Sequence, residues 1–234
     1  MSGKQYIVVG GSHGIGLGIV KRILAKGDQV LVISRTCDQL AGLDGVLHLP
    51  VDVTADDISA SQLPEKIDGL VYCPGSINLG PFRGLKPAAM LDDYQLNVVG
   101  GVKCLQAALV GLKAVEKSSV VFFSTVAVAQ GLPMHSSIAA SKGAIEALTR
   151  TLAVELAPKI RVNCVAPALT DTPLAAKFLG SDDKRSAMAD RYPLKRIGTV
   201  DDIAAAAEFL LGDQAGWITG QVVGVDGGMS TLRN

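Results

Sequence analysis

The sequence lacks any excess of charge and is poor in cysteine, and both shortages narrow the possible functions. Its 22 basic residues are balanced by 22 acidic ones, and no dense basic run occurs. Nucleic acid and an anionic membrane surface are therefore not expected as partners. The four cysteines, Cys37, Cys73, Cys104 and Cys164, form no CxxC pair. We expect free thiols, a cytoplasmic location and no metal site.

The chain also lacks a long apolar run, an internal repeat and a low-complexity tract. No apolar run is long enough for a membrane span, and the first, YIVVGG from residue 6, leads directly into a glycine loop. We therefore expect a strand there and no signal peptide. With 48% apolar and 19% charged residues and no linker, residues 1–234 are expected to fold as a single soluble domain.

What the sequence does have is an alternation of strand-like and helix-like segments. Short apolar, β-branched runs predict buried parallel strands at 6–10, 29–34, 45–53, 68–73, 119–125, 160–167 and 221–228. Amphipathic stretches predict helices at 14–26, roughly 92–115, 136–157 and 200–211. With right-handed crossovers, this alternation predicts a doubly wound α/β fold (a Rossmann fold) of about seven strands with helices on both faces.

The helix expected at 136–157 illustrates how the boundaries are set. Ser136 and Ser137 are candidates for its N-cap, and Pro158 is expected to end it. Apolar residues recur along one face at helical spacing, at Ile138, Ile145, Leu148, Leu152 and Leu156.

A glycine-rich loop follows the first predicted strand. In VVGGSHGIG, Gly10, Gly14 and Gly16 stand between a strand and a helix. Glycines there permit a tight turn and a close approach of the backbone to a pyrophosphate, which the helix N-terminus stabilises. Glycine is common in any strand-to-helix turn, but its place at the first crossover favours nucleotide binding.

Further motifs follow in order along nearly the whole chain, which thereby resembles the short-chain dehydrogenase/reductase family. Departures from the family pattern include Val9, where threonine is usual, and Ala168, where glycine is usual. The segment YCPG (72–75) also stands where the family has NNAG. The motifs that carry the resemblance are GGSHGIG, VDVT, YCPG, LNVVG, FFSTVAV, SKGAIEALTRTLAVELA, VNCVAPALTDT and GWITGQVVGVDGG.

The resemblance implies a nicotinamide cofactor, and the end of the second strand indicates which one. Ser34 stands where an aspartate would bind the ribose diol of NAD, and Arg35 follows it. A small residue beside a guanidinium favours a 2′-phosphate, so NADP(H) is the expected cofactor, with His13 as a second donor. The alternative makes Arg35 a solvated surface residue. The expected cofactor-binding residues are Gly10, Ser12, His13, Gly14, Ile15, Gly16, Ser34, Arg35, Asp52, Val53, Cys73, Pro74, Gly75, Lys142, Pro167, Ala168, Thr170 and Thr172.

The resemblance also implies a catalytic tetrad, and one member is missing. Lys142 and Asn97 match the family's lysine and asparagine, and Thr125 takes the place of its serine. Ile138 stands four residues before Lys142, where the family has the tyrosine that donates a proton. Losing a positioned general acid costs ~10²–10⁴-fold in rate.

Histidine is the best candidate for a replacement acid. His135 precedes Lys142 by seven residues, where the enoyl-thioester reductase branch of the family places its tyrosine, and two helical turns bring it to the same side. The alternatives are that His135 anchors a polar group of the substrate, or that it contacts only solvent or a backbone carbonyl. Tyr192 is a weaker candidate, for which packing of the lid is the alternative, and Tyr94 is expected to pack into the core.

The sequence therefore supports an NADPH-dependent oxidoreductase that transfers hydride to a carbonyl or an activated C=C bond of a small organic substrate. The proton would come from a group other than tyrosine, either His135 or water. The main alternative is a catalytically inactive NADP(H)-binding protein that acts as a sensor or assembly partner, and a further one is a non-redox use of the fold. The resemblance also implies a substrate lid at about 173–198. It further implies a homodimer or homotetramer formed through the helices at roughly 92–115 and 136–157.

Overall fold

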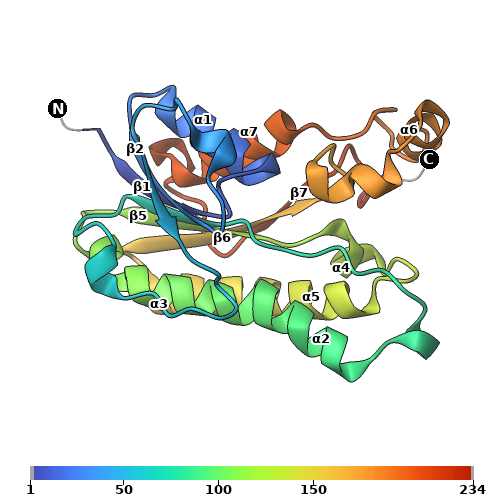
Figure 1. Ribbon diagram of the computed structural model, residues 1–234, viewed down its shortest axis with the longest axis horizontal. Coiled ribbons are helices and arrows are strands. Elements are labelled where there is room, and N and C mark those ends of the chain that lie inside the picture. The colour runs from blue at the N-terminus through green and yellow to red at the C-terminus, as the bar shows by residue number, and fades with distance from the viewer. Residues whose placement is uncertain (1–2, 233–234) are drawn as a thin grey trace.

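A seven-stranded parallel sheet runs through the middle of the protein (Figure 1), in a computed structural model that describes residues 3–232. The strand order is β3-β2-β1-β4-β5-β6-β7. The prediction of a doubly wound fold in a single domain is confirmed, as are all seven predicted strands. The strands are β1 Gln5–Val9, β2 Gln29–Ser34, β3 Val46–Pro50, β4 Gly69–Tyr72, β5 Ser118–Phe123, β6 Ile160–Pro167 and β7 Val222–Val225.

Helices cover both faces of the sheet and enclose two apolar cores. Helices α1 (Gly14–Leu24) and α7 (Val200–Leu211) pack on one face, while α2 (Pro87–Tyr94), α3 (Gly100–Lys113) and α5 (Ser136–Leu156) lie along the other (Figure 1). Successive strand residues point to opposite faces, so Ile7 enters one core and Val8 the other, and both are fully buried. This two-sided burial explains why the strands are continuous apolar runs.

The helix expected at roughly 92–115 starts earlier, at Pro87, whose fixed φ suits the first helical turn. It runs through a π-helical turn, Gln95–Val99, before continuing as α3. Its 27 residues are long and apolar enough to cross a membrane, contrary to expectation, and half of the apolar window is buried within the protein.

The start of α5 and the presence of two short helices differ from the prediction, whereas the end of α5 agrees with it. The N-cap of α5 is His135, not Ser136 or Ser137, and it makes no side-chain capping bond. Two short helices, α4 (Val126–Gln130) and α6 (Asp182–Ala189), carry too little apolar periodicity to be predicted. The C-terminal boundary of α5 agrees with the prediction, because the helix ends at Leu156, just before Pro158.

Strands β2 and β3 are added on one side of β1, and strands β4 to β7 are added on the other side. Because β1 and β4 are parallel neighbours, their carboxyl ends lie side by side. A Cβ atom added to Gly10, just after β1, would lie 3.1 Å from Pro74 Cδ, just after β4. The two loops therefore touch at the switch point, which is where doubly wound folds bind their ligands.

Candidate active site and nucleotide cleft

The glycine loop takes the shape that a bound pyrophosphate requires. Gly10 and Gly14 have φ angles of 74° and 50°, in the left-handed region that favours glycine. A Cβ atom on Gly16 would lie 2.2 Å from the carbonyl oxygen of Gly10, so no other residue fits there. His13 precedes α1 without capping it, because its Nδ1 instead lies 2.8 Å from Ser12 Oγ. The first N–H groups of α1 are therefore available to an anion.

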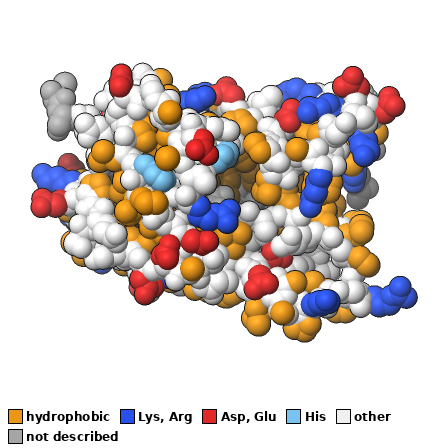
Figure 2. Space-filling view, in the orientation of Figure 1, with side chains coloured by type: hydrophobic (Ala, Val, Ile, Leu, Met, Phe, Trp, Pro, Cys, Tyr) orange, Lys and Arg blue, Asp and Glu red, His pale blue; other side chains and the backbone are white. Residues whose placement is uncertain are grey.

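The turn after β6 forms the wall opposite the glycine loop. Pro167 ends the strand, and Thr172 caps the following 3₁₀ turn by accepting a hydrogen bond from the N–H of Ala175 at 3.3 Å. A Cβ atom on Gly14 would lie 3.6 Å from Thr172 Cβ. The loops after the first and sixth strands, whose residues are more than 150 positions apart, thus come into contact. In Figure 2 the surface is hollowed between a histidine and a basic side chain.

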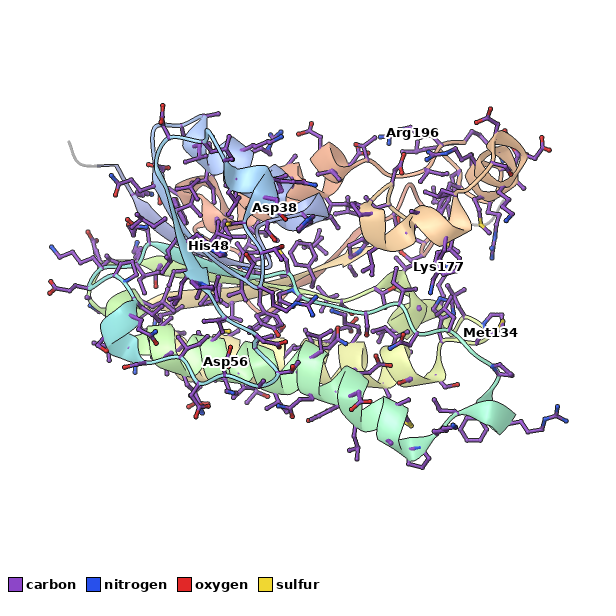
Figure 3. The ribbon with its side chains drawn as sticks, in the orientation of Figure 1. Asp38, His48, Asp56, Met134, Lys177 and Arg196 are labelled. Carbon is purple, nitrogen blue, oxygen red and sulfur yellow. The ribbon has the colours of Figure 1, made fainter. Side chains whose placement is uncertain are left out.

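The ends of β2 and β3 form the part of the cleft expected to hold the adenosine. Ser34 is buried and donates its hydroxyl to the carbonyl oxygen of Thr36 at 2.8 Å, so this hydroxyl is engaged within the protein. His48 Nε2, which the sequence analysis missed, lies 3.0 Å from the carbonyl oxygen of Ser34 and fixes the end of β2 (Figure 3). Arg35 is exposed and donates no hydrogen bond within residues 3–232. Its guanidinium is therefore the group available to a phosphate.

Asp52 and Val53 follow β3 on the same side of the cleft. Val53 is buried in the core, whereas Asp52 accepts hydrogen bonds from the Thr54 N–H at 2.9 Å and the Thr54 hydroxyl at 2.6 Å. These bonds, with a smaller contribution from Arg35, hold the pKa of Asp52 below its usual range. The carboxylate thus stays ionised and fixed in place.

Lys142 and Asn97 converge on Gly75, in the loop after β4. A Cβ atom on Gly75 would lie 3.3 Å from Asn97 Oδ1 and 3.4 Å from Lys142 Nζ, so any other residue there would crowd both groups. Lys142 is 7% exposed, and burial lowers its pKa to about 8. Within residues 3–232, neither Lys142 Nζ nor Asn97 Oδ1 has a hydrogen-bond partner. Buried polar atoms are nearly always paired, so the two groups suit a polar ligand beside Gly75.

The π-helical turn carries Asn97 into this position. The Asn97 Nδ2 group donates to the carbonyl oxygen of Asp93 at 2.8 Å and to Ser76 Oγ at 3.2 Å, which fixes the plane of the amide. Tyr72 donates to the carbonyl oxygen of Leu96 at 2.6 Å and ties the turn to β4. π-Helical turns occur frequently at functional sites.

Ser124 and Thr125 follow β5 directly and have different partners. Thr125 Oγ1 accepts a hydrogen bond from the N–H of Ala127 at 3.3 Å and caps α4, which leaves its O–H group able to donate. Ser124 donates to Glu146 Oε1 on α5 at 2.7 Å. Of the two hydroxyls, that of Thr125 is the one whose proton has no acceptor among residues 3–232.

His135 and Ile138 stand at the start of α5. Ile138 is buried and has no proton to donate. His135 is half-buried, and its Nδ1 lies 2.7 Å from the carbonyl oxygen of Pro133. A carbonyl oxygen only accepts, so Nδ1 carries the hydrogen and Nε2 is left for other contacts. The contact with a backbone carbonyl, one of the expected alternatives, thus occupies only one of the two ring nitrogens.

None of the four tyrosines is placed to act in the cleft as a mobile phenol. Burial raises the pKa of Tyr6, Tyr72 and Tyr192. Tyr192 is buried, and its hydroxyl oxygen accepts a hydrogen bond from the N–H of Leu169 at 3.3 Å. Tyr94, expected in the core, is instead 44% exposed. It lies at the end of α2, with its side chain partly open to solvent.

The segment expected to form a lid, at about 173–198, begins as a 3₁₀ turn, Pro173–Phe178, followed by α6. Lys177 donates from this segment to the carbonyl oxygen of Ile77 in the loop after β4, at 3.0 Å. The same loop is linked to the residue before His135, because Gly80 N–H donates to the carbonyl oxygen of Met134 at 3.0 Å. Figure 3 shows Lys177 on the lid and Met134 in the layer below it.

Metal-binding and thiol chemistry have little support in this cleft. Across residues 3–232, no three His, Cys, Asp or Glu side chains are grouped to hold a metal ion. All four cysteines are free thiols, and burial raises the pKa of Cys73, at the end of β4, to about 12. A thiol with so high a pKa is neutral and unreactive near pH 7.

Comparison with known proteins agrees with this geometry. A family model described as enoyl-(acyl carrier protein) reductase matches residues 9–230. The chain is 35% identical to 2-(S)-hydroxypropyl-CoM dehydrogenase 3 of Xanthobacter autotrophicus, with 96% of each protein covered. A short-chain type dehydrogenase/reductase from Mycobacterium ulcerans superposes with a TM-score of 0.90 at 31% identity, covering 100% of this chain and 93% of that one. ElxO with NADP bound superposes with a TM-score of 0.88 at 25% identity, covering 98% and 100%.

We predict that replacing Lys142 by methionine stabilises the protein. The substitution keeps the aliphatic stem but removes a buried ammonium, and we expect the free energy of unfolding at pH 7 to rise by about 2 kcal/mol. Because the folded-state pKa is about 8 and the ordinary value is 10.5, the unfolded state binds more protons between these values. The contribution of Lys142 to stability therefore becomes less unfavourable from pH 8 to 10.5 in the wild type only.

Urea unfolding at pH 7 and pH 10 measures both effects. The matched control is Lys113→Met at the exposed end of α3, which should change stability little at either pH. A Lys142→Met variant that is no more stable than the wild type at pH 7 would contradict the prediction.

Proposed function

The chain belongs to the short-chain dehydrogenase/reductase family of NAD(P)-dependent oxidoreductases, and on that premise we propose that it is an NADPH-dependent reductase. It transfers hydride to a carbonyl or an activated C=C bond of a small organic substrate, and His135 supplies the proton that tyrosine supplies elsewhere in the family. The observation that carries the proposal is the convergence of Lys142 Nζ and Asn97 Oδ1 on Gly75, each without a partner in the described residues.

The residues present fit a dinucleotide. The glycine loop and the uncapped start of α1 suit its pyrophosphate, and Lys142 and Asn97 suit the hydroxyl groups of its nicotinamide ribose. Pro167 to Thr172 offer backbone groups to the carboxamide. When bound, the nicotinamide supplies the hydride.

Arg35 supports the choice of NADPH over NADH. Its guanidinium is exposed at the end of β2 and makes no hydrogen bond within the described part of the chain. Ser34 is small, and its hydroxyl is turned inward to Thr36, so it leaves space without repelling a phosphate. A planar guanidinium binds a phosphate through two parallel hydrogen bonds.

The chain's own residues account for charge and proton handling. The ammonium of Lys142 lies in a buried environment, where its electrostatic effect on bound groups is stronger than in water. Thr125 can donate its O–H to an oxygen on which negative charge develops, because its own oxygen already accepts from the Ala127 N–H. Ile138 adds an apolar surface that excludes water near these groups.

His135 can deliver the proton through Nε2. In the imidazolium form both ring nitrogens carry hydrogen, and loss of the Nε2 proton leaves the neutral tautomer that Pro133 already stabilises at Nδ1. The ring thus needs no rotation between the two protonation states. Lys177 ties the lid to the loop after β4 and helps to close the cleft above this position.

We predict that Arg35→Ala lowers the affinity for NADPH about 10- to 100-fold and leaves the affinity for NADH unchanged. One charge-assisted pair of hydrogen bonds is worth roughly that much. Titration of nucleotide fluorescence measures both affinities, with the exposed Arg83→Ala as the matched control. Equal losses for the two nucleotides would rule out phosphate recognition by Arg35, and a wild-type protein that binds neither nucleotide would end the proposed function.

We predict that His135→Ala lowers the rate of hydride transfer about 10²- to 10⁴-fold, as expected for loss of a general acid, while NADPH affinity is kept. Stopped-flow oxidation of NADPH, after a screen of carbonyls, enones and quinones, measures the rate. Ser136→Ala, at the exposed neighbouring position, is the control. Ile138→Tyr in the His135→Ala background should restore part of the rate.

A His135→Ala variant with the wild-type rate would exclude histidine as the donor. NADPH binding without oxidation by any compound in the screen would favour the alternative, an inactive NADP(H)-binding protein.

We further propose that two copies pair through α3 and α5, because both helices carry valines exposed to solvent. Val110 is 74% exposed on α3 and Val154 is 82% exposed on α5. We predict that the wild type sediments as a dimer or tetramer and that Val154→Glu dissociates it by burying a charge. Leu47→Glu, at an exposed position on β3, should leave the assembly intact. A wild-type monomer of about 24 kDa would contradict this assignment.

A further inference from the structure

A buried carboxylate lies next to the site and belongs to none of the family motifs. Asp93, on α2, is 1% exposed, and its side chain accepts three hydrogen bonds. Asn78 Nδ2 donates to Oδ1 at 2.7 Å and Ser76 donates to the same oxygen, while Ser137 donates to Oδ2. All three donors are neutral groups, and Asn78 Nδ2 can only donate, so the arrangement suits an ionised carboxylate.

The three donors come from the two walls of the catalytic cleft. Ser76 follows Gly75 directly, and Ser137 immediately precedes Ile138. Ser76 Oγ also accepts a hydrogen bond from Asn97 Nδ2, while the backbone carbonyl of Asp93 accepts a second one. Asp93 thereby connects the loop after β4, the π-helical turn and the first turn of α5 through a single side chain.

Lys142 approaches the same loop, because a Cβ atom on Gly75, which directly precedes Ser76, would lie 3.4 Å from Lys142 Nζ. Cys73 of β4, Cys164 of β6 and Asp93 of α2 are the groups whose negative charge would favour the ammonium. Burial raises the pKa of both thiols to about 12, so near pH 7 they are neutral.

The nearby Glu146, one helical turn after Lys142, is bound by Ser124 and Arg150. Among the described groups that act on Lys142, Asp93 is therefore the one carboxylic acid.

Hydrogen bonds between α2, the loop after β4 and α5 would not by themselves require a negative charge at position 93. Burying a carboxylate among neutral donors is unfavourable, and an asparagine could accept and donate hydrogen bonds at the same position with less desolvation. What an aspartate adds over an asparagine here is a negative charge, and Lys142, whose Nζ faces Gly75 next to Ser76, lies within its field.

We propose that Asp93 is a positioning residue that acts through Lys142 and Asn97. Its carboxylate is the fixed counter-charge that keeps Lys142 an ammonium, and through Ser76 it sets the amide plane of Asn97. Both groups then face Gly75 in the orientation that a nicotinamide ribose needs. The use of this arrangement in hydride transfer rests on the proposed function, whereas the arrangement itself does not.

The test is a titration of the Lys142 side chain in the nucleotide-free protein. Nuclear magnetic resonance of ¹³Cε- and ¹⁵Nζ-labelled lysine, with Lys142→Met to assign the signal, gives the midpoint. Asp93→Asn keeps the shape and removes the charge, and the Ser137 hydroxyl can turn to accept from the amide NH₂ that replaces Oδ2. Loss of a nearby negative charge disfavours the ammonium, so we expect the midpoint to fall by about 1 pH unit or more. Asp92→Asn, the exposed neighbour on the same helix, should leave it unchanged.

A second measurement uses no variant of Asp93 and covers the case in which Asp93→Asn does not fold. The ¹³C signal of the Asp93 carboxyl group should shift at the same pH as Lys142 titrates in the wild type, and this inflection should vanish in Lys142→Met. An Asp93→Asn midpoint equal to that of the wild type, or a carboxyl signal with no inflection at the Lys142 midpoint, would overturn the proposal. Both results are obtained without nucleotide, so their failure leaves the NADPH assignment standing.

Discussion

The burial of one ammonium group, that of Lys142, is the constraint on which the rest of the site depends. A cation 7% exposed on a core-facing helix needs an anion nearby and acceptors around it. Gly75 leaves the space into which Nζ points, Asn97 Oδ1 faces the same space, and Asp93 supplies the field. Each of these features depends on a particular local structure. Gly75 is the glycine after β4, Asn97 lies in the π-helical turn of the long helix, and Asp93 is bound by Ser137 in the first turn of α5.

The fold explains why these polar groups are compatible with a stable apolar core. The sheet is buried on both faces, so the polar groups are confined to its carboxyl edge, where the strands end and loops begin. There the hydrogen bonds of Ser76, Asn78 and Ser137 satisfy a carboxylate that the apolar interior could not accommodate. The same edge carries the glycine loop and the turn after β6, so the residues proposed to bind the nucleotide and those proposed to act in catalysis lie at one edge of the sheet.

The sequence predicts the parts of this arrangement that depend on local pattern. Strands, the glycine loop and Lys142 follow from apolar periodicity and from motifs within a few residues. Asp93 could not be found in this way, because in LDDYQLN it is indistinguishable from a solvated helix residue like its neighbour Asp92. Its partners come from segments 15 to 44 positions away. Ser137 was interpreted as a helix cap because the local pattern indicates one. Its hydroxyl instead makes a tertiary contact with Asp93, which no local pattern encodes. His48 was missed because a strand residue gives no sign of a neighbouring strand's carbonyl.

In the proposed mechanism, the position of the proton donor also follows from the buried ammonium. A phenol gains from a cation beside it, because the cation stabilises the phenolate left after proton transfer. For an imidazolium the effect of the cation is reversed, because a nearby ammonium repels the imidazolium before it gives up its proton. A histidine at position 138, one turn from Lys142, would meet that repulsion in full. At position 135 two turns, about 10 Å along the helix axis, separate the two groups. There the repulsion is weaker and partly screened by solvent at the half-buried ring. An apolar residue at 138 with histidine at 135 is thus the arrangement that keeps both Lys142 and a cationic acid in one cleft.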